Sequence, residues 1–141
     1  MIMGERTLPG ASDDAMAHPM IQALLQELSA KLLALACDRH PDHIDLHRLP
    51  LPPGGLQTLR DWLGRGEISA TVTALGVTAI QETALAGVWW VEHSKASGEP
   101  VGSSLEISEC PALLAVQQQD VASAAERLRE RLSKPALPGQ G

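Results

Sequence analysis

Two adjacent tryptophans, Trp89 and Trp90, lie in a valine-flanked run that is typical of a β-strand. They are two of the three tryptophans in a 141-residue chain that has no phenylalanine and no tyrosine. Successive side chains of a strand point to opposite faces of its sheet. One indole therefore enters a core, and we expect a partner, a second subunit or another chain segment to cover the other. Because Val88 shares a face with Trp90, we expect Trp90 to be the core residue.

Apolar residues at spacings of three and four predict two helices before this strand. From Met20 to Leu35 the spacing predicts a long amphipathic helix that begins at Pro19 and is stopped by Pro41. A shorter helix is expected from about Pro53 to Leu63, and Gly64 supplies its C-terminal stop. Residues 38–53 between them, rich in His and Pro, are predicted to be a loop.

Alternating apolar and polar residues predict strands in the middle of the chain. The expected strands cover residues 68–74, 77–83, 88–94 and 103–110. Their connections are short and contain Gly76, Gly87 and Gly98. Connections of this length are hairpins, so the strands should form an antiparallel meander.

After the last strand, Asp120 is placed to cap a final helix. This helix carries an apolar stripe that consists of Val121, Ala124, Ala125, Leu128 and Leu132. The order of elements predicts an α+β fold, a four-stranded antiparallel meander sheet with helices packed on one face. The other face is left with polar side chains and one Trp, so we expect a client or a homodimer contact there. A single domain is expected over residues 18–132, between flexible tails at 1–17 and 133–141.

Three ordered stretches carry a family likeness from about Leu46 to Leu132. They are LPLPPGGL with LGRGEISA at 49–56 and 63–70, IQET with GVW at 80–83 and 87–89, and ECPALL at 109–114. In this order they resemble the hydrogenase expression/formation proteins of the HupH-like group, in their C-terminal domain. Members of this group are usually longer than this chain.

The resemblance implies an accessory protein, chaperone or scaffold, in the maturation of nickel–iron hydrogenases. Its partner would be a hydrogenase subunit, above all the small iron–sulfur subunit, or another maturation protein. The resemblance implies no catalysis and no cofactor. It raises Gln81 and Glu82 to client-contact or fold-defining residues. With the two strand tryptophans, Trp89 and Trp90, they are the residues expected to bind the partner.

A second hypothesis is a metal-handling protein. Cys37, His40, His43 and His47 form a cluster of thiol and imidazole groups, which suit zinc or nickel. However, Pro41 breaks the helix between them, and their spacing matches no standard zinc motif. We therefore expect a polar surface loop and no bound metal.

A third hypothesis is a small enzyme that uses Glu82 as its acid or base. A carboxylate in the middle of a strand is either buried with a raised pKa or exposed on the sheet face and paired across the strands. No nucleophile–base pairing is legible in the sequence. We therefore expect no catalytic residue.

Charge and hydropathy exclude further classes of function. A net charge of −6 and a pI near 5.3 argue against binding to the nucleic-acid backbone. We find no run of about 18 apolar residues, and residues 1–17 lack the apolar core of a secretory signal. We therefore expect a cytoplasmic protein that does not enter the membrane, with Cys37 and Cys110 as buried free thiols.

Overall fold

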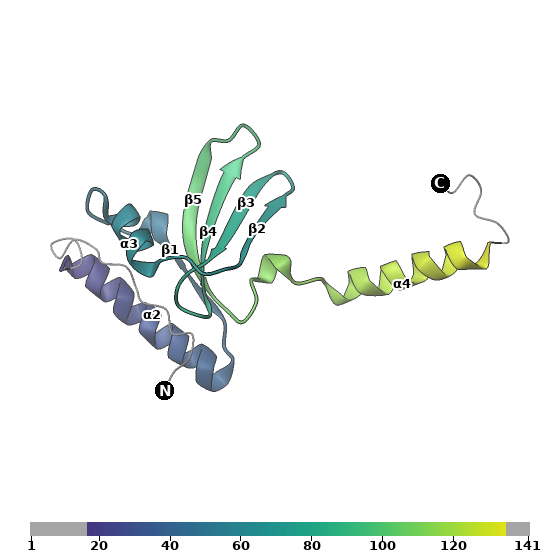
Figure 1. Ribbon diagram of the computed structural model, residues 1–141, viewed down its shortest axis with the longest axis horizontal. Coiled ribbons are helices and arrows are strands. Elements are labelled where there is room, and N and C mark those ends of the chain that lie inside the picture. Colours follow the sequence, from purple (N-terminus) through teal and green to yellow (C-terminus); the bar gives the residue numbers. More distant parts are fainter. Residues whose placement is uncertain (1–16, 135–141) are drawn as a thin grey trace.

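The computed structural model describes residues 17–134, which form three α-helices, two short 3-10 helices and one sheet (Figure 1). The tails that we predicted at residues 1–17 and 133–141 fall almost wholly outside the described residues.

The long N-terminal helix, α2, spans Pro19–Asp38. Nδ1 of His18 accepts the backbone N–H of Met20 at 3.2 Å, and Pro19 occupies the first helical position. The helix ends at Arg39, whose backbone is left-handed with φ of 53°, two residues before Pro41. Its buried residues lie on one side and are Ile21, Leu24 and Leu28.

The short helix, α3, spans Gly55–Leu63 and buries Leu59 and Leu63. Gly64, with φ of 71°, ends it and donates its N–H to the carbonyl of Arg60. Before α3 come a strand, β1 (Asp42–Asp45), and a 3-10 turn, η1 (Leu46–Arg48). The two helices that the sequence predicted before the four-strand meander are thus confirmed.

The sheet is antiparallel throughout and has the order β1-β5-β4-β3-β2. Its consecutive strands are β2 (Ser69–Thr73), β3 (Gly76–Glu82), β4 (Val88–Lys95) and β5 (Pro100–Ile107). These four form the predicted meander. They place β2 at one edge of the sheet and β1 at the other.

The described sheet has five strands, so the prediction of four was wrong. β1 lies inside residues 38–53, which we expected to be a loop. It pairs with β5, with Ile44 opposite Leu105 in the core. Four residues with one inward apolar side chain are too few to show a period of two, and only the neighbouring strand makes them a strand.

The main core lies between the sheet and the two helices α2 and α3, which cover the same face. Its buried residues are Leu24, Leu28, Ile44, Leu46, Leu59, Leu63, Val88, Trp90, Leu105 and Ile107. The guanidinium of Arg60 stands 5.4 Å from the centre of the Trp90 ring. That guanidinium and the Trp90 indole N–H both donate to the Glu92 carboxylate, at 2.6 and 3.2 Å.

The last helix, α4 (Gln118–Ser133), does not pack on the sheet, contrary to our prediction. It buries no residue and extends away from the body after a 3-10 turn, η2 (Ala112–Leu114) (Figure 1). Gln117, not Asp120, occupies the N-cap position. An apolar stripe shows that a helix face seeks a contact, but it does not say which surface supplies it.

Both cysteines are exposed free thiols, so the expectation of burial was also wrong. Cys37 lies about two and a half helical turns after Leu28, which puts it on the side of α2 opposite that core residue. Cys110 follows the end of β5.

α2 has the length and apolar composition of a membrane-crossing helix, unlike the expectation from the sequence. Core helices, which are mostly buried, and signal sequences pass the same test; α2 contributes Leu24 and Leu28 to the main core, and 22% of its apolar stretch is buried. The helix by itself is therefore weak evidence for a membrane segment.

Candidate interaction surface

The sheet face turned away from α2 and α3 is called the open face here. Strand register sets its members, because Trp89 stands opposite both Glu82 and Glu106, and His93 stands opposite Thr78. From β1 to β2 the face carries His43, Asp45, Ser104, Glu106, Trp89, Val91, His93, Thr78, Ile80, Glu82, Ala70 and Val72.

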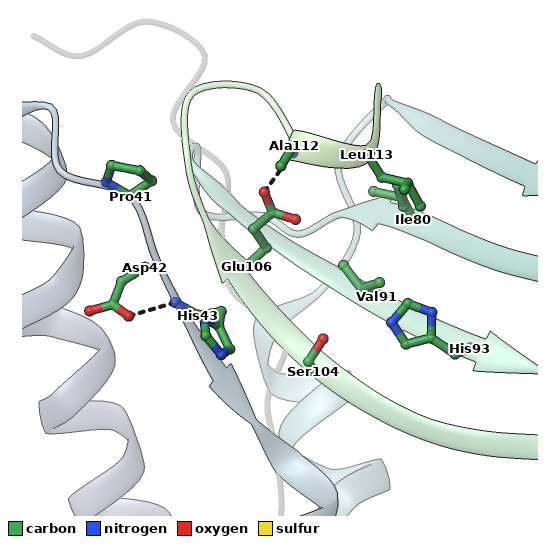
Figure 2. A pocket seen from close by; sticks show the side chains of 10 residues that line it. All are labelled: Pro41, Asp42, His43, Ile80, Val91, His93, Ser104, Glu106, Ala112 and Leu113. Atoms are coloured by element: carbon green, nitrogen blue, oxygen red, sulfur yellow. Dashed lines mark hydrogen bonds between the residues drawn. The ribbon is translucent and has the colours of Figure 1, made fainter. Parts of the chain in front are cut away.

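A hollow of about 540 Å³ lies on the open face, beneath η2 (Figure 2). Ile80 and Val91 are apolar residues on its sheet side, and Leu113 of η2 reaches over Ile80. The carboxylate of Glu106 accepts the backbone N–H of Ala112 at 2.8 Å, which holds η2 against the sheet. Polar residues at the rim of the hollow include His43, His93 and Ser104.

Trp89 lies on the open face, yet only 6% of it is exposed. Its indole N–H donates to the carbonyl of Ser108 at 3.0 Å, and it packs in a small second core with Ile80 and Val91. The sequence left open whether a partner, a second subunit or another segment of the chain covers this indole. The structure shows a segment of the chain, because the residues after β5 cross this face. Trp90 is 2% exposed in the main core, as we predicted.

The polar ends of Gln81 and Glu82 make contacts inside the protein. Nε2 of Gln81 lies 3.0–3.2 Å from the carbonyls of Gly66, Ile68 and Glu82. Glu82 is 8% exposed, and its carboxylate accepts the N–H of Glu67 at 3.1 Å. Both side chains therefore hold the loop between α3 and β2, and Glu82 does not line the hollow.

Thr83 is a structural residue that the sequence did not single out by role. Its hydroxyl lies 2.9 Å from the carbonyl of Val88, to which it donates, and accepts the N–H of Leu85 at 3.1 Å. Gly87, with φ of 91°, completes the turn, and a Cβ there would stand 3.2 Å from Leu35. The IQET and GVW motifs thus build one turn. The sequence pattern that could have revealed the role of Thr83 is a Thr followed by a Gly four residues later.

The four residues of the metal hypothesis are brought together only in part, because His43 and His47 line one small hollow with Asp45 and His93, but Cys37 and His40 do not. Nδ1 of His47 lies 2.7 Å from the carboxylate of Asp45, His43 lies on the open face, and Cys37 is exposed on α2. Within residues 17–134 no group of three or more His, Cys, Asp or Glu side chains is arranged to hold a metal ion.

Two ion pairs tie α2 to the sheet side of the molecule. Nζ of Lys31 donates to the Asp42 carboxylate at 2.7 Å, which lowers the pKa of Asp42 and raises the pKa of Lys31. Arg39 makes two hydrogen bonds to Glu109, at 3.0 and 3.2 Å. The second pair fixes the segment that crosses the open face to the end of α2.

Residues 20–134 match the family model described as the HupH hydrogenase expression protein, C-terminal conserved region. The chain is 40% identical over 98 residues to the hydrogenase expression/formation protein HupQ of Azotobacter chroococcum mcd 1, covering 70% of this chain and 34% of the relative. It is 28% identical over 129 residues to HupH of Rhodobacter capsulatus, covering 92% of this chain and 46% of the relative. The chain therefore spans a third to a half of these relatives.

A solved structure shares the fold over nearly its whole length. It is the hydrogenase expression protein HupH from Thiobacillus denitrificans ATCC 25259, with a TM-score of 0.75 and 36% sequence identity. The match covers 88% of this chain and 98% of that one.

Proposed function

Because the chain belongs to the HupH family of hydrogenase expression/formation proteins, we propose that it binds a hydrogenase subunit on its open face. In this proposal it is a cytoplasmic chaperone or scaffold in nickel–iron hydrogenase maturation. The small, iron–sulfur-bearing subunit is the proposed client. The protein turns over no substrate.

The hollow beneath η2 is the observation that carries the proposal. It has apolar residues in Ile80, Val91 and Leu113, and polar groups beside them in His43 and His93. An apolar centre inside a polar rim is the anatomy of protein–protein contact sites. The Glu106 carboxylate accepts hydrogen bonds from the chain, so its role is to hold η2.

The four residues predicted to bind the partner keep a part in this proposal. Trp89 supports Ile80 and Val91 from within the small second core. Gln81 and Glu82 hold the loop at the end of β3, and Trp90 anchors β4 in the main core. We propose that they shape the surface that the client contacts, while the direct contacts come from the lining of the hollow.

The test is binding of this protein to a purified hydrogenase small subunit, measured by biolayer interferometry. Leu113→Glu puts a charge at the roof of the hollow, at a residue that is already half exposed. Leu33→Glu makes the same change at an exposed position on α2. We expect Leu113→Glu to weaken binding at least tenfold, about 1.4 kcal/mol, and Leu33→Glu to bind like the wild type.

Thermal melting of both variants serves as the folding control. Equal affinity of Leu113→Glu and the wild type would remove the hollow from the contact surface. If only the large subunit binds, and Leu113→Glu still weakens that binding, the face is right and the proposed client is wrong.

A further inference from the structure

β2 is an edge strand with none of the usual protection against pairing. Its free edge borders no other strand, since β3 is its single neighbour in the sheet that the structure describes. Natural edge strands are guarded by Lys, Pro or inward charges. β2 reads Ser-Ala-Thr-Val-Thr, and the sequence is free of charged residues from Ile68 to Gln81. The strand is therefore open to a further strand.

The hydrogen bonds to β3 show which backbone groups of β2 face outward. Glu82 N–H donates to the carbonyl of Ile68 at 2.8 Å, and Ala74 N–H donates to the carbonyl of Gly76 at 2.9 Å. Antiparallel ladders alternate, so the even-numbered residues of β2 direct their N–H and C=O groups toward β3. Those of Ser69, Thr71 and Thr73 then point to the free edge.

We propose that β2 pairs with β2 of a second copy of this chain, antiparallel, about a two-fold axis at Thr71. In this register Thr71 meets its own counterpart, and Ser69 meets Thr73 of the other copy. The outward N–H and C=O groups of Ser69, Thr71 and Thr73 in both strands then all hydrogen-bond across the new strand pair. The two sheets join into one, and the two open faces become continuous.

The side chains of β2 suit this symmetric pairing. On one face Thr and Ser stand opposite Thr, which is a favourable cross-strand pair, and on the open face the small apolar Ala70 stands opposite Val72 of the other copy without a clash of charge. Isologous contacts require this kind of self-complementarity. Net charge opposes self-association, because each copy carries −6, but the uncharged stretch from Ile68 to Gln81 keeps like charges out of this contact and so limits the repulsion.

Exposed apolar residues at both ends of β2 also fit a second copy. Ile68 is 51% exposed and Leu75 is 99% exposed. The proposed register places Ile68 opposite Ala74 of the other copy, beside its Leu75. In Figure 1 α4 leaves the body on the side where β2 is the outermost strand, and its apolar stripe is uncovered.

The experiment compares the mass in solution of the full chain and two variants at Thr71, by light scattering at micromolar to tens of micromolar protein. Thr71→Pro removes an outward N–H and leaves the β2–β3 ladder intact, since Pro is tolerated at this kind of edge position. Thr71→Ala keeps the N–H and is the matched control. We expect a dimer for the wild type and Thr71→Ala, and a monomer with native-like melting for Thr71→Pro.

A charge exchange tests the two-fold axis itself. Thr71→Lys and Thr71→Glu each place like charges face to face, so each alone should be monomeric. An equimolar mixture should recover a one-to-one dimer, which a merely unfolded variant cannot do. Failure of the mixture to dimerise would overturn the register.

Other results would overturn the proposal as a whole. A wild-type monomer would do so, as would a Thr71→Pro dimer, which would place the contact elsewhere, for example on α4. A wild-type monomer whose binding to the hydrogenase small subunit is lost in Thr71→Pro would assign β2 to a client strand. The mass measurement needs no hydrogenase subunit, so it can fail independently of the proposed function.

Discussion

The Thr83 hydroxyl closes the turn between β3 and β4 in a position with no exposed surface. Thr83→Val keeps the shape but leaves the part-buried N–H of Leu85 without its hydroxyl acceptor, and leaves the buried carbonyl of Val88 with the Thr83 backbone N–H alone. We expect a loss of about 1–3 kcal/mol in the free energy of unfolding, measured in urea. Thr83→Ser retains the hydroxyl and should lose clearly less; a Thr83→Val protein as stable as the wild type would show that the hydroxyl's hydrogen bonds do not stabilise the turn.

Both strand tryptophans are predicted to be stabilising, because both are buried. Trp89→Ala and Trp90→Ala should each lower the free energy of unfolding by about 3–5 kcal/mol. Thermal and urea unfolding measure this, with Trp62→Ala, a half-buried position, as a milder comparison. A Trp89→Ala protein that melts like the wild type would mean that the segment after β5 does not cover the open face in solution.

The ion pair between Lys31 and Asp42 predicts a small pH dependence. The hydrogen bond from Lys31, and a second one from His43 N–H, lower the pKa of Asp42, so the folded protein favours its ionised form. This stabilisation is present above the ordinary carboxyl pKa of about 3.9 and disappears as the pH falls through the lower folded value. Asp42→Asn should cost less than about 1 kcal/mol at pH 7, because both side chains are partly exposed, and less at pH 2 than at pH 7.

Urea unfolding at the two pH values measures this effect, with Asp38→Asn as an exposed control. The same loss from Asp42→Asn at both pH values would show that the pair stabilises through packing and not through charge.

At the scale of elements, α4 is predicted to be dispensable for the stability of the domain. Removing residues 118–141 takes away no buried residue among those described. We expect the melting temperature to change little, by an amount equivalent to about 0.5 kcal/mol or less. Removing α2 instead should unfold the domain, because α2 supplies Leu24 and Leu28 to the core. A large loss on removing α4 would show that the helix packs on a surface in solution.

Histidines in and next to β1 and η1 allow the metal hypothesis to be tested. Replacing His40, His43 and His47 together with Ala should change the melting temperature little, since these are surface changes. Protein purified without a histidine tag should contain no stoichiometric zinc or nickel by elemental analysis. Metal that is present in the wild type and lost in the triple variant would make metal handling the better function.

At the scale of the whole molecule, the sheet has one covered face and one face that is only partly covered. α2 and α3 bury the first face, and a single crossing segment with its 3-10 turn shelters the centre of the second. Around that shelter remain a hollow, an unguarded edge strand and an unpacked helix. These features match a protein that acts by contact with other chains.

Local sequence determined much of this architecture. Periodicity of three and four, with the stops at Pro41 and Gly64, identified α2 and α3, because one helix face must carry the apolar residues. Periodicity of two and short glycine connections identified the four-strand meander. The motifs around Ile80–Trp89 indicated the family. Trp90 was placed in the core because it shares a strand face with Val88.

Only the tertiary structure decided what meets each of these faces. It made β1 a strand through pairing with β5, covered Trp89 with the segment that holds Ser108, and left the stripe of α4 without a partner. It also turned Gln81 and Glu82 toward the loop after α3. A sequence pattern specifies which side of an element is apolar, whereas burial depends on which distant segment arrives there, and that is a property of the folded chain alone.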